Sequence, residues 1–455
     1  MSKQTPADRK KKGKAIRKTV PRSSHADWSP PADRPDPVDL ITGQDKERLQ
    51  WLVPIRHSRM AVSAFTFYRG AAKVMAADLA GTPATGLSAQ ICGDAHLSNF
   101  GSFASPERQQ LFDINDFDET LPGPWEWDLK RLATSFVLAG HDNDFKQTDI
   151  TPIVTQSVAS YRQAMAKFAT ARTMDTWYAH ISVQQIADAL PKKKDRAQVT
   201  KSAAKARSKD SLKAASKLTH EVDGQLRIKS QPPLLIPLRD VADQDKAESL
   251  RKDVHQSLSG YRSTLTDDRK LLLDRFHIVD IALKVVGVGS VGTRCMIVLF
   301  AGKDDGDPLF LQVKEATDAV VEDYLPKSTY PLHGQRVVEG QRLMQAYGDI
   351  FLGWSVKSSG HQYYTRQFHD MKGSADVAAM NPRRMGGYAK ICGAALAHAH
   401  ARSGDSIAIA GYLGSGDTFD RAVTKFAFAY ADQNQQDYET FKTAIATGKI
   451  KAKEG

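Results

Sequence analysis

Two short polar loops, separated by a stretch with the composition of a β-hairpin, constrain this chain more than any other feature. The first loop is residues 93–100 (GDAHLSNF) and the second is residues 115–119 (NDFDE). Between them, an apolar segment, a turn around Ser105-Pro106-Glu107 and a second apolar segment predict two short antiparallel strands. Such a hairpin would return Asp116 to the side of Asn99. We therefore expect carboxylate and amide oxygens from both loops to gather in one place.

Asp94, Asn99 and Asp116 supply the groups that phosphoryl transfer requires. These are an acid side chain beside the attacking hydroxyl and oxygen ligands for magnesium beside the phosphates. Asp94 and Asn99 are five positions apart, as are the base and the metal-holding amide of the kinase H-R-D-x-x-x-x-N pattern, although Cys92-Gly93 replaces the His-Arg pair. This predicts Asp94 as catalytic base and Asn99 and Asp116 as magnesium ligands. The alternative is a plain turn, because Asp and Asn hydrogen-bond their own backbone there.

A glycine-rich segment, residues 287–292 (GVGSVG), lies almost two hundred residues downstream. A dinucleotide-binding fingerprint would need a helix after it, but residues 293–300 have the composition of a strand. The glycines therefore connect strand to strand, as in a kinase loop that covers phosphates. The candidate phosphate-binding residues of this segment are Gly287, Gly289, Ser290 and Gly292.

A strand predicted over residues 309–316 carries Lys314, at the position of the kinase lysine that grips the α- and β-phosphates. The alternative is an edge-strand lysine that faces water. Residues 334–344 have helical spacing and would hold the glutamate that pairs with this lysine. Glu339 is our candidate and Glu322 is its rival, while a solvated surface glutamate is an equal alternative for both.

The front motifs resemble those of the aminoglycoside and choline kinase group, which has a Gly-Asp-x-His-x-x-Asn loop, a hydrophobic strand, Asp-Phe-Asp and a later aromatic-Asp-Leu-Ala. The matching positions are Asp94, His96, Asn99, Asp116-Phe117-Asp118 and Trp127-Asp128-Leu129. This resemblance implies that Asp128 is a buried partner that ties down the catalytic loop. It also implies structural roles for His96, through a hydrogen bond, and for Asp118.

The whole chain also resembles the uncharacterised bacterial family called domain of unknown function 2252. The resemblance runs from about Arg59 to Gly414. It rests on the segments 68–70 (YRG), 93–96 (GDAH), 115–120 (NDFDET), 124–128 (PWEWD), 287–294 (GVGSVGTR), 371–374 (MKGS) and 400–405 (HARSGD). It implies a kinase-like fold and names no substrate.

The order of the motifs is reversed relative to an ordinary kinase, where the glycine loop and lysine precede the catalytic loop. We infer a two-lobed, protein-kinase-like α+β fold that is circularly permuted, with an interlobe hinge at residues 369–373. The predicted domains are a disordered basic arm over residues 1–37, a helical lobe with the catalytic and metal loops over 38–270, a β-rich nucleotide-binding lobe over 271–370, and returning helices of the helical lobe over 371–455.

The formal charge of +11 is concentrated at the N-terminus, where residues 1–22 hold nine Lys or Arg against one Asp and leave about +3 for the rest. Such an arm either only adds solubility or makes weak, salt-sensitive contact with nucleic acid. A second lysine-rich tract, residues 192–217, predicts an exposed helix pair. It is either a solvated face or an attractor of anionic substrate.

The remaining composition excludes several classes. Cys92, Cys295 and Cys392 are far apart in sequence, so we expect no disulfide and a cytoplasmic location. No run approaches the about 18 apolar residues of a membrane span. The sequence thus predicts a phosphotransferase that uses ATP and Mg²⁺ and acts on an unknown small-molecule or protein acceptor. A nucleotide-binding pseudokinase that serves as an interaction module, and a nucleotidyl transferase that uses the same cleft, are the alternatives left open.

Overall fold

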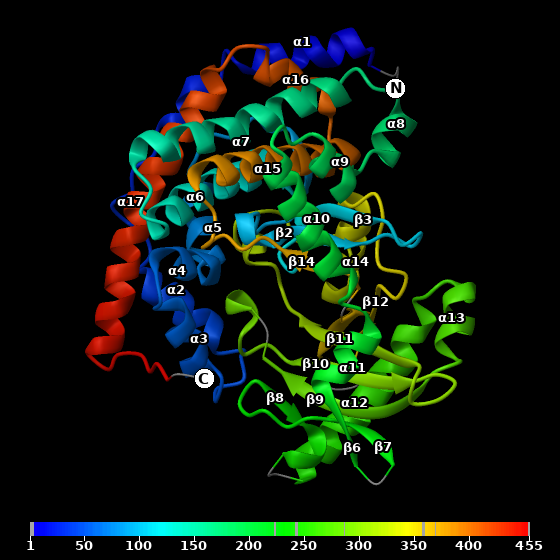
Figure 1. The fold of residues 1–455 in the computed structure, drawn as a ribbon. Helices are drawn as coiled ribbons and strands as arrows, with labels where there is room; N and C mark the ends of the chain where they lie inside the picture. The colour runs from blue at the N-terminus through cyan, green and yellow to red at the C-terminus, as the bar shows by residue number, and fades with distance from the viewer. Residues whose placement is uncertain are drawn as a thin grey trace.

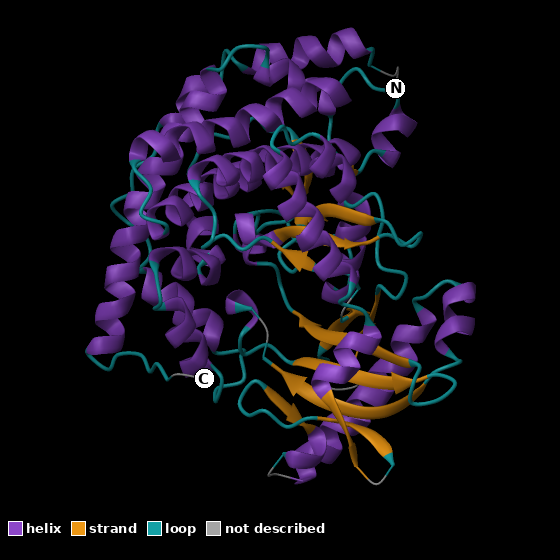
Figure 2. Ribbon diagram, in the orientation of Figure 1, coloured by secondary structure: helices purple, strands orange, loops and turns teal. Residues whose placement is uncertain are grey.

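The computed structural model describes residues 4–222, 224–241, 244–285, 287–356, 360–368 and 370–453. Helices gather in one lobe and a six-stranded antiparallel sheet forms the centre of a second lobe, as Figures 1 and 2 show. The predicted α+β class is therefore confirmed. In the part of the chain that is described, no helix combines the length and apolar character needed to cross a membrane.

The helical lobe is built on α6 (Trp125–Asp142), α7 (Gln147–Phe168) and α15 (Pro382–Ser403), with α17 (Thr418–Ala446) beside them. Asn381 caps the start of α15 and Gly404 follows its last residue, as expected of a polar N-cap and a C-terminal glycine. The smaller helices of this lobe are α2 (Pro37–Asp45), α3 (Val53–Met60), α4 (Ala64–Gly70), α5 (Ala72–Ala80), α8 (Thr173–Tyr178), α9 (Val183–Asp188) and α16 (Ser406–Leu413).

The N-terminal segment is folded from residue 4 on, which corrects the prediction of a disordered arm over residues 1–37. Helix α1 (Pro6–Ile16) runs along α16 (Figure 1). A Cβ on Gly13 would lie only 2.0 Å from the backbone oxygen of Ala408, so the two helices meet backbone to backbone. Arg9 forms an ion pair of 2.7 Å with Asp405. The basic residues of α1 therefore lie on a docked helix and not in a free tail.

The sheet of the second lobe has the strand order β12-β13-β11-β10-β9-β8. Its strands are β8 (Leu235–Pro237), β9 (His277–Lys284), β10 (Cys295–Ala301), β11 (Pro308–Ala316), β12 (Gly353–Val356) and β13 (Gln362–Gln367). Every residue of β10 and β11 is buried. Alternate residues of these strands pack against α12 (Gln244–Ser263) on one face and α11 (Ser211–Leu218) on the other. Both faces are covered, which explains the continuous apolar composition of these strands.

The β-rich lobe begins earlier than residue 271, because α11, the hairpin β6 (Thr219–Val222) and β7 (Gln225–Ile228), β8 and α12 all belong to it. The predicted boundary is therefore wrong. The lysine-rich tract forms α10 (Lys193–Arg207) and α11, a largely exposed helix pair as predicted. α13 (Asp267–Leu273) follows α12, and α14 (His333–Met344) lies between the lobes, where it contacts β12, β13, α15 and β1.

Two small sheets in the helical lobe carry the polar loops. The strands are β1 (Ser88–Ile91), β2 (Phe100–Ala104), β3 (Gln110–Ile114), β4 (Leu121–Pro124), β5 (Ile181–Ser182) and β14 (Gly373–Ser374). β2 pairs with β3 from Phe100 opposite Ile114 to Ala104 opposite Gln110, which confirms the predicted hairpin. In the predicted hinge, His369 lies outside the described residues, while β14 pairs with β2.

Candidate active site

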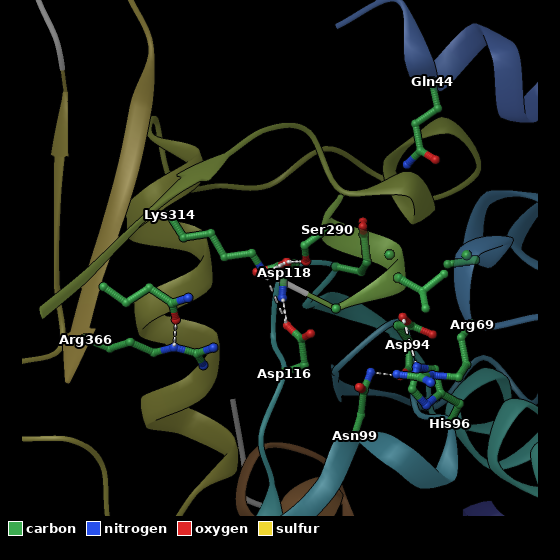
Figure 3. A pocket seen from close by; sticks show the side chains of 17 residues that line it. Gln44, Arg69, Asp94, His96, Asn99, Asp116, Asp118, Ser290, Lys314 and Arg366 are labelled. Atoms are coloured by element: carbon green, nitrogen blue, oxygen red, sulfur yellow. Dashed lines mark hydrogen bonds and ion pairs between the residues drawn. The ribbon is translucent and has the colours of Figure 1, made fainter. Parts of the chain in front are cut away.

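One cleft brings together residues from both halves of the chain (Figure 3). It has a volume of about 140 Å³ and lies where the polar loops of the helical lobe face the β-rich lobe. Of the residues predicted from sequence, those that line it are Asp94, His96, Asn99, Asp116, Asp118, Gly287, Gly289, Ser290 and Lys314. Gly292, Asp128 and Glu339 do not line it.

Lys314 is the link between the two lobes. Its strand, β11, is central in the sheet, and its side chain is almost fully buried. The ammonium group forms an ion pair with Asp118 and lies 4.0 Å from a carboxylate oxygen of Asp116. Tyr364, opposite Lys314 on β13, donates a hydrogen bond of 2.7 Å to Asp118. A lysine on an exposed sheet edge is therefore ruled out.

The electrostatics of this group follow from burial and proximity. Burial opposes the charge on Lys314, but Asp116 and Asp118 outweigh it and hold the pKa of this lysine well above its usual value. Burial likewise opposes ionisation of Asp118, yet Lys314 and the hydrogen bond from Tyr364 keep the pKa of Asp118 below its usual value. Burial, together with the neighbouring Asp118 charge, raises the pKa of Asp116. Asp116 is thus the carboxylate of the pair that a cation would stabilise most.

Glu339 does not pair with Lys314, which corrects our candidate. Its carboxylate accepts a hydrogen bond of 2.9 Å from Arg342, three residues on, and its side chain is 27% exposed. The rival, Glu322, accepts hydrogen bonds from the backbone N–H groups of Ala319 and Ser328. Asp118 is therefore the partner of this lysine.

Glu339 does not reach Lys314 because a different face of α14 packs against the loop that carries Asp118. Arg336 and Gly340, four positions apart, share that face. Arg336 donates to the backbone oxygens of Asp118 and Thr120 at 2.8 and 2.7 Å, and a Cβ on Gly340 would lie 2.4 Å from Thr120. Glu339 is one residue, about 100°, away from Gly340 around the helix. Its side chain is therefore turned away from the loop that Lys314 contacts.

Asp94 lies at the opposite end of the cleft, against a buried arginine. The Nε of Arg131, on α6, donates to the Asp94 carboxylate at 2.5 Å, and the Nε2 of His96 is 3.8 Å away. Burial raises the pKa of Asp94 to about 6, although Arg131 opposes this shift. The residue is therefore ionised near neutral pH and still basic enough to accept a proton.

The loop that carries Asp94 is fixed by the helices beneath it. Asp128 is buried and accepts hydrogen bonds from the backbone N–H groups of Cys92 and Gly93 at 2.8 and 3.0 Å. His400, on α15, lies 3.2 Å from the same carboxylate and also contacts Tyr161 at 2.9 Å. Asp128 therefore lies beneath the loop that carries Asp94 and binds its backbone. His96 differs, because its Nδ1 has no hydrogen-bond partner among the described residues.

Asn99 joins the two polar loops. Its side-chain nitrogen donates to the backbone oxygen of Asp94 at 2.8 Å, and its own backbone oxygen accepts from Asn115 at 2.8 Å. The amide oxygen of Asn99 is left as the atom that can bind a metal. Oxygen donors from Asn99 and Asp116 are the type that Mg²⁺ prefers.

The glycine segment closes the cleft from the β-rich lobe as a short turn, η4 (Val288–Ser290). The hydroxyl of Ser290 lies 3.5 Å from Asp118. Gly292 is outside the cleft lining, and its φ of +93° is a left-handed conformation that favours glycine. Its role is to turn the chain, and its backbone oxygen accepts from Leu49 at 2.7 Å.

Four arginines near the cleft were missed in the sequence. They are Arg69, Arg131, Arg336 and Arg366. Arg366 donates to Gln312 and to the backbone oxygen of Asn115, at 3.0 and 3.1 Å. The spacing of Arg131 three residues after Asp128 on one helix was a usable signal, because residues three apart lie on the same face. Arg336 had no such signal.

Fold and cleft together define a two-lobed α+β protein with a lysine- and carboxylate-rich site between its lobes. The model of a bacterial family, described as an uncharacterized protein conserved in bacteria (DUF2252), matches residues 48–444, and the chain belongs to this family. No curated protein and no solved structure matches the chain.

Proposed function

We propose that this protein is an ATP-dependent phosphotransferase with a circularly permuted, protein-kinase-like arrangement of lobes. The observation that carries the proposal is the contact of Lys314 with Asp118, 196 positions apart in sequence, beside Asp116 and opposite Asp94. Phosphoryl transfer from a nucleotide needs a cation for the phosphates, acidic metal ligands and a base within one cleft. The reversed order of the motifs along the sequence is compatible with this proposal, because residues from both halves of the chain line the same cleft.

At the nucleotide end, Asn99 and Asp116 would hold Mg²⁺, which when bound neutralises phosphate oxygens. Lys314 and Arg366 add positive charge there, and the backbone of Gly287 and Gly289 allows close approach of phosphates, because glycine has no side chain. The cleft volume of about 140 Å³ is below the about 300–1,000 Å³ of pockets that enclose whole ligands. The cleft as observed therefore suits the phosphate end of a nucleotide.

At the acceptor end, Asp94 would orient the acceptor hydroxyl and take its proton. Arg131 holds the carboxylate in one orientation through its 2.5 Å contact. A base with a pKa of about 6 combines ionisation at neutral pH with appreciable basicity, which suits general base catalysis. The acceptor, a small molecule or a protein, is left open.

The deciding experiment follows label from ATP. Protein, magnesium and a cell extract are incubated with γ-labelled or α-labelled ATP, and label is measured in small-molecule and protein fractions. Phosphotransfer predicts γ-label only, and D94A should lower it by at least about a hundredfold. The matched control is D405N, since Asp405 also follows a glycine but caps α16 outside the cleft.

Nucleotide binding is measured in parallel as the shift of the melting temperature, because a ligand that binds only the folded state stabilises it. Mg-ATP should raise the melting temperature of the wild type and of D94A, while D116N should lose the dependence on magnesium. Binding without transfer would favour the pseudokinase, and transfer of α-label would favour a nucleotidyl transferase. The absence of any shift at millimolar nucleotide would contradict all three.

A further inference from the structure

The Asp94 end of the cleft holds an arginine that forms no direct ion pair in the described part of the chain. Arg69, near the end of α4, lines the cleft close to Asp94 and His96 (Figure 3). Among the described residues, its guanidinium forms neither an ion pair nor a hydrogen bond, and its Nε is buried without a partner. The ring of Phe65 lies 5.9 Å from the guanidinium carbon, and the charge of Asp94 acts on Arg69 without forming an ion pair with it.

Every other cation of the cleft is engaged. Arg131 contacts Asp94, Lys314 contacts Asp118, and Arg366 donates to Gln312 and to a backbone oxygen. Arg131 holds the Asp94 carboxylate by direct contact, whereas Arg69 acts on it only electrostatically. Arg69 is left without a directly contacting acceptor among the described residues, and its charge favours an anion at this end of the cleft.

A helix begins at the same place. α5 starts at Ala72, directly beyond Arg69, and both Gly70 and Ala72 line the cleft. The residue at the N-cap position, Ala71, offers no side chain to the first N–H groups of α5, and no other side chain caps them in the described structure. Uncapped N–H groups and the positive end of the helix dipole favour a bound anion.

His96 is a third unused donor. Its side chain is 3% exposed and lines the cleft, its Nδ1 has no partner among the described residues, and its Nε2 is too far from Asp94, at 3.8 Å, for a hydrogen bond. A buried polar atom without a partner costs free energy, which a ligand that accepts its hydrogen bond would recover.

We propose that Arg69, His96 and the start of α5 form an oxyanion site at the Asp94 end of the cleft. The proposal deepens the phosphotransferase function and rests on it for the origin of the anion. Two sources offer the same chemistry: the γ-phosphoryl group of the nucleotide, and a phosphate or carboxylate group on the acceptor. In either case the planar guanidinium of Arg69 can donate two parallel hydrogen bonds to the anion.

Binding of Mg-ATP, Mg-ADP and inorganic phosphate to the full chain, measured by titration calorimetry, tests the site without knowledge of the acceptor. Phosphate is titrated into both the free and the Mg-ADP-loaded protein. The variants are R69Q and R69K, and R69K keeps the proposal testable if R69Q folds poorly. The control is R421Q, since the exposed Arg421 near the start of α17 pairs with the exposed Asp417, away from the cleft lining.

If the γ-phosphoryl group is the ligand, R69Q should weaken Mg-ATP at least about tenfold and leave Mg-ADP unchanged, because a charged hydrogen bond is worth about 1.5–3 kcal/mol and 1.4 kcal/mol is tenfold. If the ligand belongs to the acceptor, both nucleotides should bind R69Q normally and phosphate should lose its affinity. R69K should lie between wild type and R69Q in both cases.

Unchanged binding of both nucleotides and phosphate in R69Q and R69K would overturn the site. So would a wild type that binds Mg-ATP no better than Mg-ADP and binds no phosphate. A wild type that binds phosphate through Arg69 but no nucleotide would instead defeat the phosphotransferase proposal and leave the oxyanion site standing. The two failures are therefore distinguishable.

Discussion

The two ends of the cleft are held in place by different means. The loop that carries Asp94 is tied to buried side chains: Asp128 accepts from two of its N–H groups, Ser135 accepts from Leu97 at 3.0 Å, and Tyr388 donates to the backbone oxygen of Leu97 at 2.8 Å. These anchors come from α6 and α15, far apart in the sequence. They fix the loop before any ligand arrives.

The glycine turn at the other end rests on the loop before α3 and on α3 and α4 themselves. Leu49 donates to the backbone oxygen of Gly292, and Arg48 donates to that of Val291 at 2.6 Å. The hydrogen bond from the side chain of Ser290 to Asp118 in the cleft is long, at 3.5 Å. The comparison teaches that the Asp94 loop is held by hydrogen bonds to side chains of two helices, whereas the glycine turn is held by hydrogen bonds from Arg48 and Leu49 and by apolar packing on α3.

Removal of the anchor under the Asp94 loop should have the largest effect on stability. D128A leaves the buried N–H of Cys92 and the partly buried N–H of Gly93 without acceptors, each worth about 1–3 kcal/mol, so the free energy of unfolding should fall by about 3 kcal/mol. Denaturant unfolding followed by circular dichroism measures it. D175A, which removes an exposed carboxylate paired with Arg172, should change it by less than about 0.5 kcal/mol. A loss below about 1 kcal/mol in D128A would contradict the anchoring role.

The pH dependence of phosphoryl transfer tests the role of Asp94 at the anchored end of the cleft. Transfer should rise with pH and level off above the pKa of Asp94, about 6, because only the ionised carboxylate accepts a proton. Burial raises this pKa and Arg131 lowers it, so R131M should move the rising limb to higher pH. An unmoved limb in a folded R131M would show that Asp94 is not the titrating base.

The raised pKa of Asp94 also determines how the free energy of unfolding changes with pH. The folded pKa of Asp94 lies above its ordinary value of 3.8, so the folded state keeps this proton longer than the unfolded chain does. The contribution of Asp94 to the free energy of unfolding should therefore fall as the pH rises from about 4 to about 6. D94N should remove that part of the slope in denaturant unfolding at several pH values.

Substitution of Gly292 in the glycine turn should lower the free energy of unfolding less than D128A does. G292A places a Cβ 3.0 Å from the side chain of Arg48 at a φ of +93°, which should cost about 1–2 kcal/mol of unfolding free energy. G287A is the matched control, since that glycine has a φ of −52° and open space around its Cβ position. Equal losses in both variants would mean that the turn conformation of Gly292 carries no special cost.

The smallest effect is expected at Glu339. E339Q removes a half-exposed pair with Arg342, so unfolding free energy should change by less than about 0.5 kcal/mol and nucleotide affinity should stay as in wild type. K314Q, by contrast, should weaken nucleotide binding at least about tenfold, because it removes a charged contact to phosphate. A loss of nucleotide affinity in E339Q would restore Glu339 as a partner of Lys314.

Local sequence signals predicted much of this molecule. Strand composition placed β10 and β11, and two apolar segments around a turn placed the hairpin of β2 and β3. The docked N-terminal helix was missed because its contacts, such as Arg9 with Asp405, join residues almost four hundred positions apart. β8 was missed because three residues carry no periodicity. Lysine-rich composition alone cannot show that a helix has a partner surface.

The site divides in the same way. Spacing within each loop identified Asp94, Asn99, Asp116 and Lys314 as candidates, and the structure gathers them around one cleft. The pairing of Lys314 with Asp118 depends on how α14 is rotated against the other lobe, which no local pattern encodes. Arginine is usually exposed at the protein surface, so the composition offered no reason to expect buried arginines beside the cleft.

The contact of Asp128 with His400 has a consequence for synthesis of the chain. The loop with Asp94 is made early, but its anchor is complete only after residue 400 has left the ribosome. The elements of the six-stranded sheet lie within residues 235–367 and can form sooner. We therefore expect the β-rich lobe of the nascent chain to fold before the loop that carries Asp94 is fully anchored.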